Sequence, residues 1–243
     1  MIEREERLAN ERAHGKKISE NAEEVWGWSS PAGQLRAQRR ANYFIELGEI
    51  NQNSKVLEIG CGSGLFTQKV YEATQAQIIA TDLSEDLLQL AKEKLPNVKF
   101  EVQDAMNLPY QPNSFDVIFG SSILHHLEME LALKGMLTLL KPNGKLIFAE
   151  PNMINPQILL QKNIPALKKA LGDSPDETAV IRWKLAKQMK KMGFSVVKIF
   201  PYDFLHPSVS SKYIAFVKKM GEWIEKTPIL KEIAGSVIIF GQK

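Results

Sequence analysis

Residues 55–64 read KVLEIGCGSG, a short apolar strand that ends in three alternating glycines. A residue without a Cβ is needed where the backbone turns sharply or approaches a ligand closely. An amphipathic stretch follows at once, so the segment predicts a strand, a glycine turn and a helix. In an open α/β sheet, the crevice beyond such a strand end is the expected ligand site.

The chain around this loop alternates between short apolar strands and amphipathic helices. This alternation is typical of a parallel sheet that is covered by helices on both faces. We expect strands at Lys55–Ile59, Gln77–Thr81, Val98–Gln103, Phe115–Gly120, Lys145–Glu150, Phe194–Phe200 and Ser236–Phe240. We expect helices at Leu65–Ala73, Glu85–Leu95, Glu128–Leu140 and Thr178–Met192, and a further helix from the Ser30-Pro31 pair to Gly48.

Carboxylates stand at the ends of the first three predicted strands. Glu58 lies just before the glycines, and Asp82 follows Gly60 by 22 residues, the spacing at which an acid accepts both hydroxyls of a ribose. Asp104 can accept from an exocyclic amine, and Met106 can lie against a purine face. The pattern predicts a nucleoside pocket.

Two enzyme classes use such a loop. The dinucleotide fingerprint has a glycine three positions after its second glycine, and here that position is Leu65. A nicotinamide-dependent dehydrogenase is therefore the weaker alternative, and it stays open.

In order along the chain, these motifs resemble those of class I S-adenosylmethionine-dependent methyltransferases. The small-molecule branch (methyltransferase type 11, similar to the ubiquinone and menaquinone biosynthesis enzymes) is the nearest in pattern. The resemblance spans residues 50–150 and includes the glycine loop, Asp82-Leu83-Ser84, Asp104-Ala105, the strand from Phe115 and the turn that begins at Leu140. It implies a Rossmann-like, doubly wound sheet of seven mostly parallel strands with an antiparallel last strand.

The resemblance also implies a cofactor, S-adenosylmethionine, with S-adenosylhomocysteine as its product. Asp82 would take the ribose, Asp104 and Met106 the adenine, and Glu58 would support the loop and the amino end. We expect Cys61 to be a small buried residue of the loop rather than a nucleophile. The cofactor-binding residues that we predict are Glu58, Gly60, Cys61, Gly62, Asp82, Leu83, Asp104, Ala105, Met106 and Ser121.

Catalysis of methyl transfer depends mainly on alignment of the acceptor, because the cofactor is already activated. A hydroxyl or acidic carbon would also need a base, and His125, after the fourth strand, is our candidate. The four histidines lack a spaced carboxylate set, so we expect no metal. The candidates for substrate contact are Trp26, Trp28, Arg36, Asn152 and Tyr202, for each of which a purely structural role stays open.

We expect an N-terminal helical arm or lid at residues 1–50 and a methyltransferase domain at 51–243. The Pro- and Gly-rich segment near 151–177 and the irregular segment near 201–234 look like insertions after the fifth and sixth strands. Together with the arm, the first insertion would close the acceptor pocket.

Composition narrows the class of protein. The chain has 243 residues, of which 44% are hydrophobic and 24% charged, as in ordinary globular proteins. We find no apolar run long enough to span a membrane and no signal core at the N-terminus, so we expect a cytoplasmic protein without a membrane partner. The single cysteine, Cys61, excludes an internal disulfide.

Charge leaves one further alternative. The chain as a whole carries +3, but residues 182–243 hold 12 Lys and Arg against 4 Asp and Glu, a local charge of +8. This imbalance keeps open an RNA-associated or cofactor-binding accessory protein. The motif after the fourth strand lacks the Asn/Asp-Pro-Pro run of amino-nucleobase methyltransferases, so we expect a small-molecule acceptor and no nucleic acid. The oligomeric state is left open.

Overall fold

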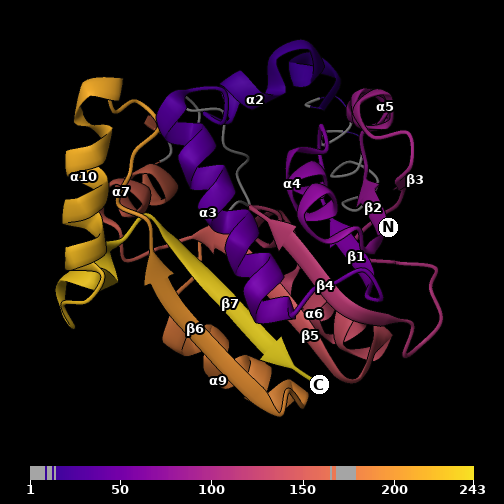
Figure 1. Ribbon diagram of the computed structural model, residues 1–243. Coiled ribbons are helices and arrows are strands. Elements are labelled where there is room, and N and C mark those ends of the chain that lie inside the picture. Colours follow the sequence, from indigo (N-terminus) through magenta and orange to yellow (C-terminus); the bar gives the residue numbers. More distant parts are fainter. Residues whose placement is uncertain (1–8, 10–12, 14, 165, 168–178) are drawn as a thin grey trace.

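The fold is a seven-stranded sheet with helices on both faces, and the computed structural model describes residues 9, 13, 15–164, 166–167 and 179–243 (Figure 1). The strand order is β3-β2-β1-β4-β5-β7-β6. Only β7 runs antiparallel to its neighbours, which confirms the predicted Rossmann-like sheet with a reversed last strand. The strands are β1 (Lys55–Ile59), β2 (Gln77–Asp82), β3 (Lys99–Val102), β4 (Phe115–Ser121), β5 (Leu140–Pro151), β6 (Val196–Tyr202) and β7 (Ser236–Gln242).

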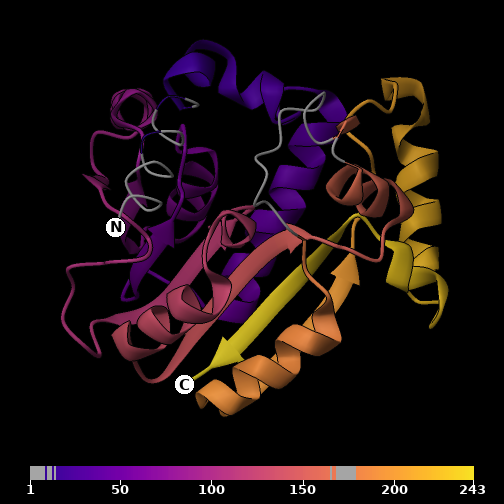
Figure 2. The same ribbon diagram turned by 180° about the vertical axis from the view of Figure 1, so that it is seen from behind.

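Helices form a layer on each face of the sheet (Figure 2). One layer contains α3 (Pro31–Gly48), α4 (Leu65–Thr74) and α5 (Glu85–Lys94), and the other contains α6 (Met129–Leu139) and α9 (Arg182–Met192). Successive strand residues serve opposite layers, because side chains alternate along a strand. Val117 and Phe119 of β4 pack with the first layer and Ile118 with the second.

The helix α3 begins where the sequence predicts. The Ser30 hydroxyl accepts a hydrogen bond from the Gly33 amide at 3.0 Å, and Pro31 occupies the first turn, where its missing N–H costs nothing. Ala37, Ala41 and Phe44 are fully buried against the sheet. Although we predicted residues 1–50 as an arm, α3 is thus a layer of the core, and the domain boundary itself stays a prediction.

Further helices lie before α3, after β4 and in the two predicted insertions. Much of the first insertion, including the start of the helix predicted from Thr178, lies outside the described residues. That helix begins instead at Arg182, because Val180 pairs with Asn152 in an isolated β-bridge. The remaining elements are η1 (Ser19–Asn21), α2 (Ala22–Val25), η2 (Leu124–His126), α7 (Pro156–Asn163), α10 (Ser211–Ile224) and η3 (Leu230–Ile233).

A search of the described helices for a membrane span gives none: no helix there combines the required length with enough apolar character.

Candidate functional site

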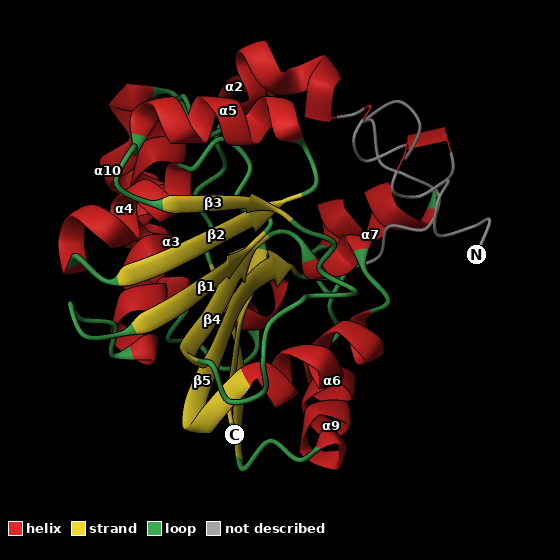
Figure 3. Cartoon of the chain, turned by 90° about the vertical axis from the view of Figure 1, so that its right-hand side faces the viewer, coloured by secondary structure: helices red, strands yellow, loops and turns green. Residues whose placement is uncertain are grey.

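A cavity of 690 Å³ opens at the carboxyl ends of β1, β2 and β4. The strand order reverses here, since β2 and β4 flank β1, and such a switch point is where α/β sheets bind ligands (Figure 3). Most of the predicted cofactor residues line this cavity: Gly60, Cys61, Gly62, Asp82, Leu83, Ala105 and Ser121. Trp26, Trp28 and the predicted base His125 line it too.

The glycine loop holds a backbone shape that other residues rarely adopt. Gly60 and Gly62 have φ angles of +68° and +53°. A Cβ on Gly62 would lie 2.8 Å from the Trp26 ring, so the loop could not carry a side chain beneath that indole. Asp82 fixes the loop from β2: one carboxylate oxygen accepts from the Gly62 amide at 2.8 Å and the other from the Ser84 amide at 2.9 Å.

Glu58 lies below the loop rather than in the cavity wall. Its side chain is buried and accepts a hydrogen bond from the Thr67 hydroxyl. Burial raises the pKa of Glu58 to about 8, with the Thr67 bond acting against the rise and nearby Asp82 adding to it. Burial, with Asp82 and Glu58 nearby, also raises the pKa of the Cys61 thiol, which argues against a nucleophilic thiolate.

Asp104 and Met106 lie beside the cavity without lining it. One Asp104 carboxylate oxygen accepts from the Met106 amide at 3.0 Å, which tightens the turn after β3. Met106 packs at the edge of the hydrophobic cluster that lies on the α6 side of the sheet. Of this turn, Gln103 and Ala105 face the cavity.

His125 forms a buried pair with Glu150. The imidazole Nδ1 and a Glu150 carboxylate oxygen are 2.8 Å apart. The other Glu150 oxygen accepts from the amides of Ile123 and Leu124 at 3.0 and 2.9 Å. Burial would raise the pKa of Glu150, but the His125 bond and the two amides together lower it. An ionised Glu150 makes Nδ1 the donor and leaves Nε2 as the basic nitrogen of a neutral ring.

The sequence analysis missed Glu150, although a signal was present. Glu150 ends the fifth predicted strand, as Glu58 and Asp82 end or follow the first and second. The parallel pairing of β4 with β5 brings the two strand ends together, with Ser121 beside Ala149. An acid at that position therefore meets the segment that follows β4.

A buried arginine stands behind the serines that follow β4. Arg40 is 3% exposed, and it donates to the hydroxyls of Ser121 at 2.7 Å and Ser122 at 3.2 Å. Its other donors reach Tyr202 and Ser236. All four partners are neutral hydroxyls, and among the described residues no carboxylate forms an ion pair with Arg40. The guanidinium also lies over the rings of Trp28 and Phe66, 5.0 and 5.8 Å from their centroids, but a buried cation without a carboxylate partner is still costly, which makes this charge a feature to explain.

Ser122 itself is strained. Its φ angle is +55°, in the left-handed region that favours glycine. Both serine hydroxyls line the cavity wall and accept from Arg40, so their own hydrogens are oriented away from the guanidinium. Strained residues of this kind gather at functional sites.

The substrate candidates separate into two groups. Trp26 and Trp28 line the cavity, and the Trp28 ring packs edge-on against Phe66, with the ring centroids 5.4 Å apart. Arg36, Tyr202 and Asn152 are used in internal contacts instead, and none of the three lines the cavity. Those contacts are an ion pair of Arg36 with Asp203 at 2.7 Å, a bond from Arg40 to the Tyr202 hydroxyl, and amide bonds from Asn152 to the carbonyls of Glu232 and Ala234.

The helix α2 covers the cavity and is tied to the loop beneath it. Glu23 accepts from the Ser63 hydroxyl at 3.1 Å and from the Lys94 ammonium at 2.6 Å. The Ser63 bond joins α2 to the glycine loop, and the Lys94 bond joins it to the end of α5. These bonds hold Trp26 over the site, in the part of the chain where the sequence analysis expected an arm or lid.

Comparison with known proteins agrees with this geometry. The profile of a family described as “Methyltransferase domain” matches residues 50–200. An uncharacterized methyltransferase-like protein of Schizosaccharomyces pombe is 28% identical over 181 residues, which cover 71% of this chain and 69% of that protein. The demethylmenaquinone methyltransferase of Paenarthrobacter aurescens is 30% identical over 156 residues, or 59% of each chain.

A solved structure shares the fold. The crystal structure of a SAM-dependent methyltransferase from Archaeoglobus fulgidus superposes with a TM-score of 0.60 at 20% identity, covering 86% of this chain and 94% of that one. At this identity the likeness concerns the fold alone.

Proposed function

The chain belongs to the methyltransferase domain family and is an S-adenosylmethionine-dependent methyltransferase, and from this premise we propose that it methylates a small, acidic molecule whose reacting atom loses a proton to His125. The observation that carries this proposal is the buried His125–Glu150 pair at the wall of the cavity, 2.8 Å apart.

The residues of the cavity fit the cofactor. The loop at Gly60 and Gly62 presents bare backbone, and Asp82 stands in the wall at the end of β2. We assign the ribose to Asp82 and the loop contacts to Gly60 and Gly62. Bound there, the cofactor supplies an electrophilic methyl group. The protein is left with aligning the acceptor and taking up its proton.

His125 is suited to take up that proton. Glu150 accepts from Nδ1 and so holds the ring in one tautomer, with Nε2 as the basic nitrogen. An ionised, buried carboxylate also stabilises the imidazolium that forms after the transfer. An acceptor with a hydroxyl or an acidic carbon requires this help, whereas an amine that is already neutral does not.

The serines after β4 support an acceptor that carries negative charge. The hydroxyls of Ser121 and Ser122 lie between Arg40 and the cavity, so the guanidinium polarises them towards a ligand. A carboxylate, phenolate or enolate oxygen placed there would accept from these hydroxyls and would compensate the Arg40 charge at short range. We therefore assign the acceptor an anionic oxygen near its reacting atom.

The cover over the cavity supports a small acceptor rather than RNA. The indoles of Trp26 and Trp28 lie in the wall, and Glu23 ties α2 down across the loop. A covered, apolar-walled site also excludes water from the transfer. The basic C-terminal third, which kept the RNA alternative open, lies largely on α9 and α10, outside the lining of the cavity.

Methyl transfer from tritium-labelled S-adenosylmethionine into a metabolite extract, fractionated by charge, tests the proposal. We expect label in a small organic acid or phenol, with the rate lowered about 100-fold or more by His125→Ala. His206→Ala is the matched control, because His206 is an exposed histidine whose imidazole bonds to nearby Ser208, outside the lining of the cavity. Label in RNA alone, or an unchanged rate in His125→Ala, would contradict it.

A further inference from the structure

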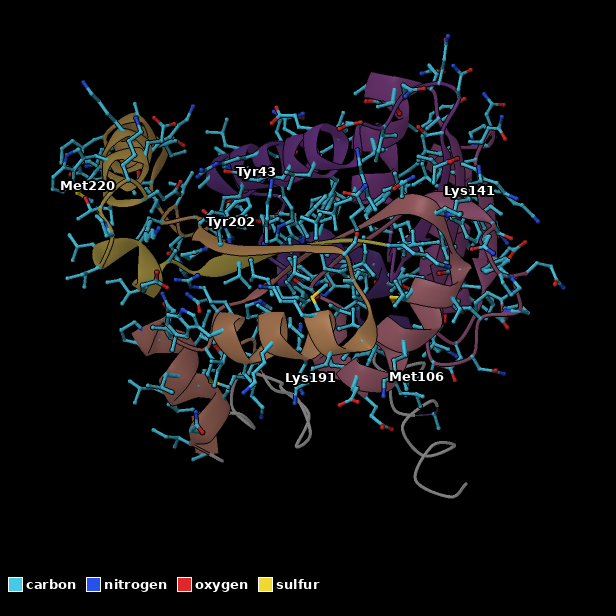
Figure 4. All side chains as sticks on the ribbon, turned by 90° about the horizontal axis from the view of Figure 1, so that it is seen from below. Tyr43, Met106, Lys141, Lys191, Tyr202 and Met220 are labelled. Atoms are coloured by element: carbon cyan, nitrogen blue, oxygen red, sulfur yellow. The ribbon has the colours of Figure 1, made fainter. Side chains whose placement is uncertain are left out.

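The helix α10 turns large apolar side chains to the outside of the molecule. Four of them are exposed: Tyr213 (53%), Phe216 (67%), Met220 (42%) and Trp223 (64%). The helix forms one edge of the molecule in both ribbon views (Figures 1 and 2). With the side chains drawn, Met220 lies at the margin of the molecule, away from Tyr43 and Tyr202 (Figure 4). A contiguous exposed apolar patch of this kind marks an interaction surface.

The spacing of these side chains makes one stripe, which we call the aromatic stripe (Tyr213, Phe216, Met220 and Trp223). Steps of three, four and three residues keep all four within about 80° of the helix circumference at 100° per residue. A different set faces the core: Ile214 and Gly221 are buried, and Val217 packs against the cluster around Leu205. The helix thus has one apolar strip that packs against the rest of the protein and a second strip beside it that is exposed.

A row of lysines borders the aromatic stripe on the side away from the core. Lys212 and Lys219 are seven residues apart, which at 100° per residue places them along one line next to the stripe, and Lys226 follows in the turn after the helix, near Glu222 and Glu225. No carboxylate pairs with any of the three among the described residues. The acids nearby are engaged elsewhere: Glu222 with Lys218, Glu225 with Arg39 and Glu232 with Arg182.

The turn after α10 extends the same surface. Ile229 is 81% exposed, and Leu230 is 42% exposed at the start of η3. Lys231 follows and adds a further positive charge. The apolar surface and the excess of positive charge therefore continue together beyond the end of the helix.

We propose that α10 and the turn at Ile229 bind the surface of an anionic membrane, with the helix axis parallel to the bilayer. Aromatic and Met side chains enter the headgroup region of a bilayer, while lysines beside them stay in water and pair with acidic headgroups. A helix that lies on a membrane in this way needs neither the length nor the uniform apolarity of a spanning helix. The sequence prediction of no membrane partner rested on spanning segments and did not address this case.

A protein partner is the alternative occupant, and the charges distinguish the two. A second copy of this chain would bring its own row of unpaired lysines to the interface, and like charges facing each other oppose association. An anionic lipid surface supplies the opposite charge over the whole row.

Vesicle co-sedimentation of the full chain tests the proposal. The probes are vesicles of phosphatidylcholine alone and of phosphatidylcholine with one-quarter phosphatidylglycerol. We expect sedimentation with the anionic vesicles only, and weaker binding as salt is raised. The double variant Phe216→Ser, Trp223→Ser should bind at least tenfold more weakly, and each lysine to alanine change in the row should cost about fivefold.

The matched control is Trp183→Ser, an exposed indole (51%) on α9 outside the aromatic stripe, which should bind as the unmodified chain does. Circular dichroism and S-adenosylhomocysteine binding establish that each variant is folded. Absence of vesicle binding overturns the proposal, as does equal binding by the double variant. A dimer in light scattering that the double variant abolishes, without lipid binding, assigns the stripe to self-association instead. Methyl transfer plays no part in this readout, so the outcome is independent of the proposed reaction.

Discussion

Replacing Glu150 by glutamine removes the negative charge behind His125 while preserving the shape of the side chain. Glu150 is fully buried and accepts three hydrogen bonds, from the His125 ring and from the amides of Ile123 and Leu124. The glutamine oxygen can still accept from both amides. Its NH₂ group would then face Nδ1 and donate to it, so the ring proton would move to Nε2.

The expected loss follows from that exchange of tautomers. With Nε2 protonated, the neutral ring has no basic nitrogen directed at the acceptor, and the contribution of the base, about 100- to 10,000-fold, disappears from kcat. This corresponds to about 3–5 kcal/mol of transition-state stabilisation. Alanine is a poorer choice for the test, because it would leave two buried amides unpaired at about 1–3 kcal/mol each.

Two measurements check the reasoning. Single-turnover rates with the acceptor identified in the extract should fall as stated, while the Kd for S-adenosylhomocysteine stays within about twofold. Nitrogen-15 NMR of the histidines should show the proton on Nδ1 of His125 in the unmodified enzyme and on Nε2 in Glu150→Gln. A variant with the altered tautomer and an unchanged rate would refute the base, and an unchanged tautomer would refute the structural premise.

Three further changes have defined outcomes. Asp82→Ala should weaken S-adenosylhomocysteine binding about 10- to 100-fold in calorimetry, as hydrogen bonds to a charged group are lost, whereas exposed Asp86→Ala should not. Because the folded pKa of Glu58 is raised to about 8, folding favours its protonated form; stability is greatest below its ordinary pKa of 4.5 and declines as pH rises towards 8. Glu58→Gln has no group to ionise, so at pH 9 its free energy of unfolding in urea should exceed that of the unmodified chain, by at most about 1.4 kcal/mol per unit of pKa shift. If the free energies of the two proteins change with pH in the same way, Glu58 titrates normally and the prediction is wrong. Ser122→Gly removes the hydroxyl but suits the positive φ angle, so it should raise the acceptor KM about tenfold without lowering Tm; a KM unchanged for an anionic acceptor would exclude the serine from that contact.

The parts of this molecule that the sequence predicted well are those governed by short-range pattern. All seven strands were expected, because each is an apolar run bounded by turn residues. The glycine loop was expected for the same reason, since it belongs to one strand–turn–helix unit, whereas Asp82 contacts the loop from the neighbouring strand β2. The start of α9 was predicted too early, because the bridge between Val180 and Asn152 joins residues that are distant in sequence.

The residues that were missed depend on packing between elements. Glu150 acquires its role only when β5 is placed beside β4. Arg36 was expected to contact the substrate but pairs with Asp203, whereas Arg40, one helical turn further along α3, is buried against hydroxyls beside the cavity. The rotation of α3 on the sheet decides this difference, and helical periodicity does not specify it to that accuracy.

The charges around the cavity differ between its two sides, the side of β1 and β2 and the side beyond β4, and each side suits a different substrate. On the side of β1 and β2 the Asp82 carboxylate faces the cavity, while Glu58, whose pKa is raised to about 8, lies beneath the loop. Beyond β4 the guanidinium of Arg40 donates to the two serines, and the carboxylate of Glu150 is occupied by His125 and the amides of Ile123 and Leu124. A cationic methyl donor is favoured on the first side and an anionic acceptor on the second, so each substrate is repelled from the place of the other. Once both are bound, their opposite charges attract along the line of transfer. Methyl transfer neutralises both charges and so removes that attraction. The same arrangement of charges that helps to bind the two substrates therefore binds the products more weakly.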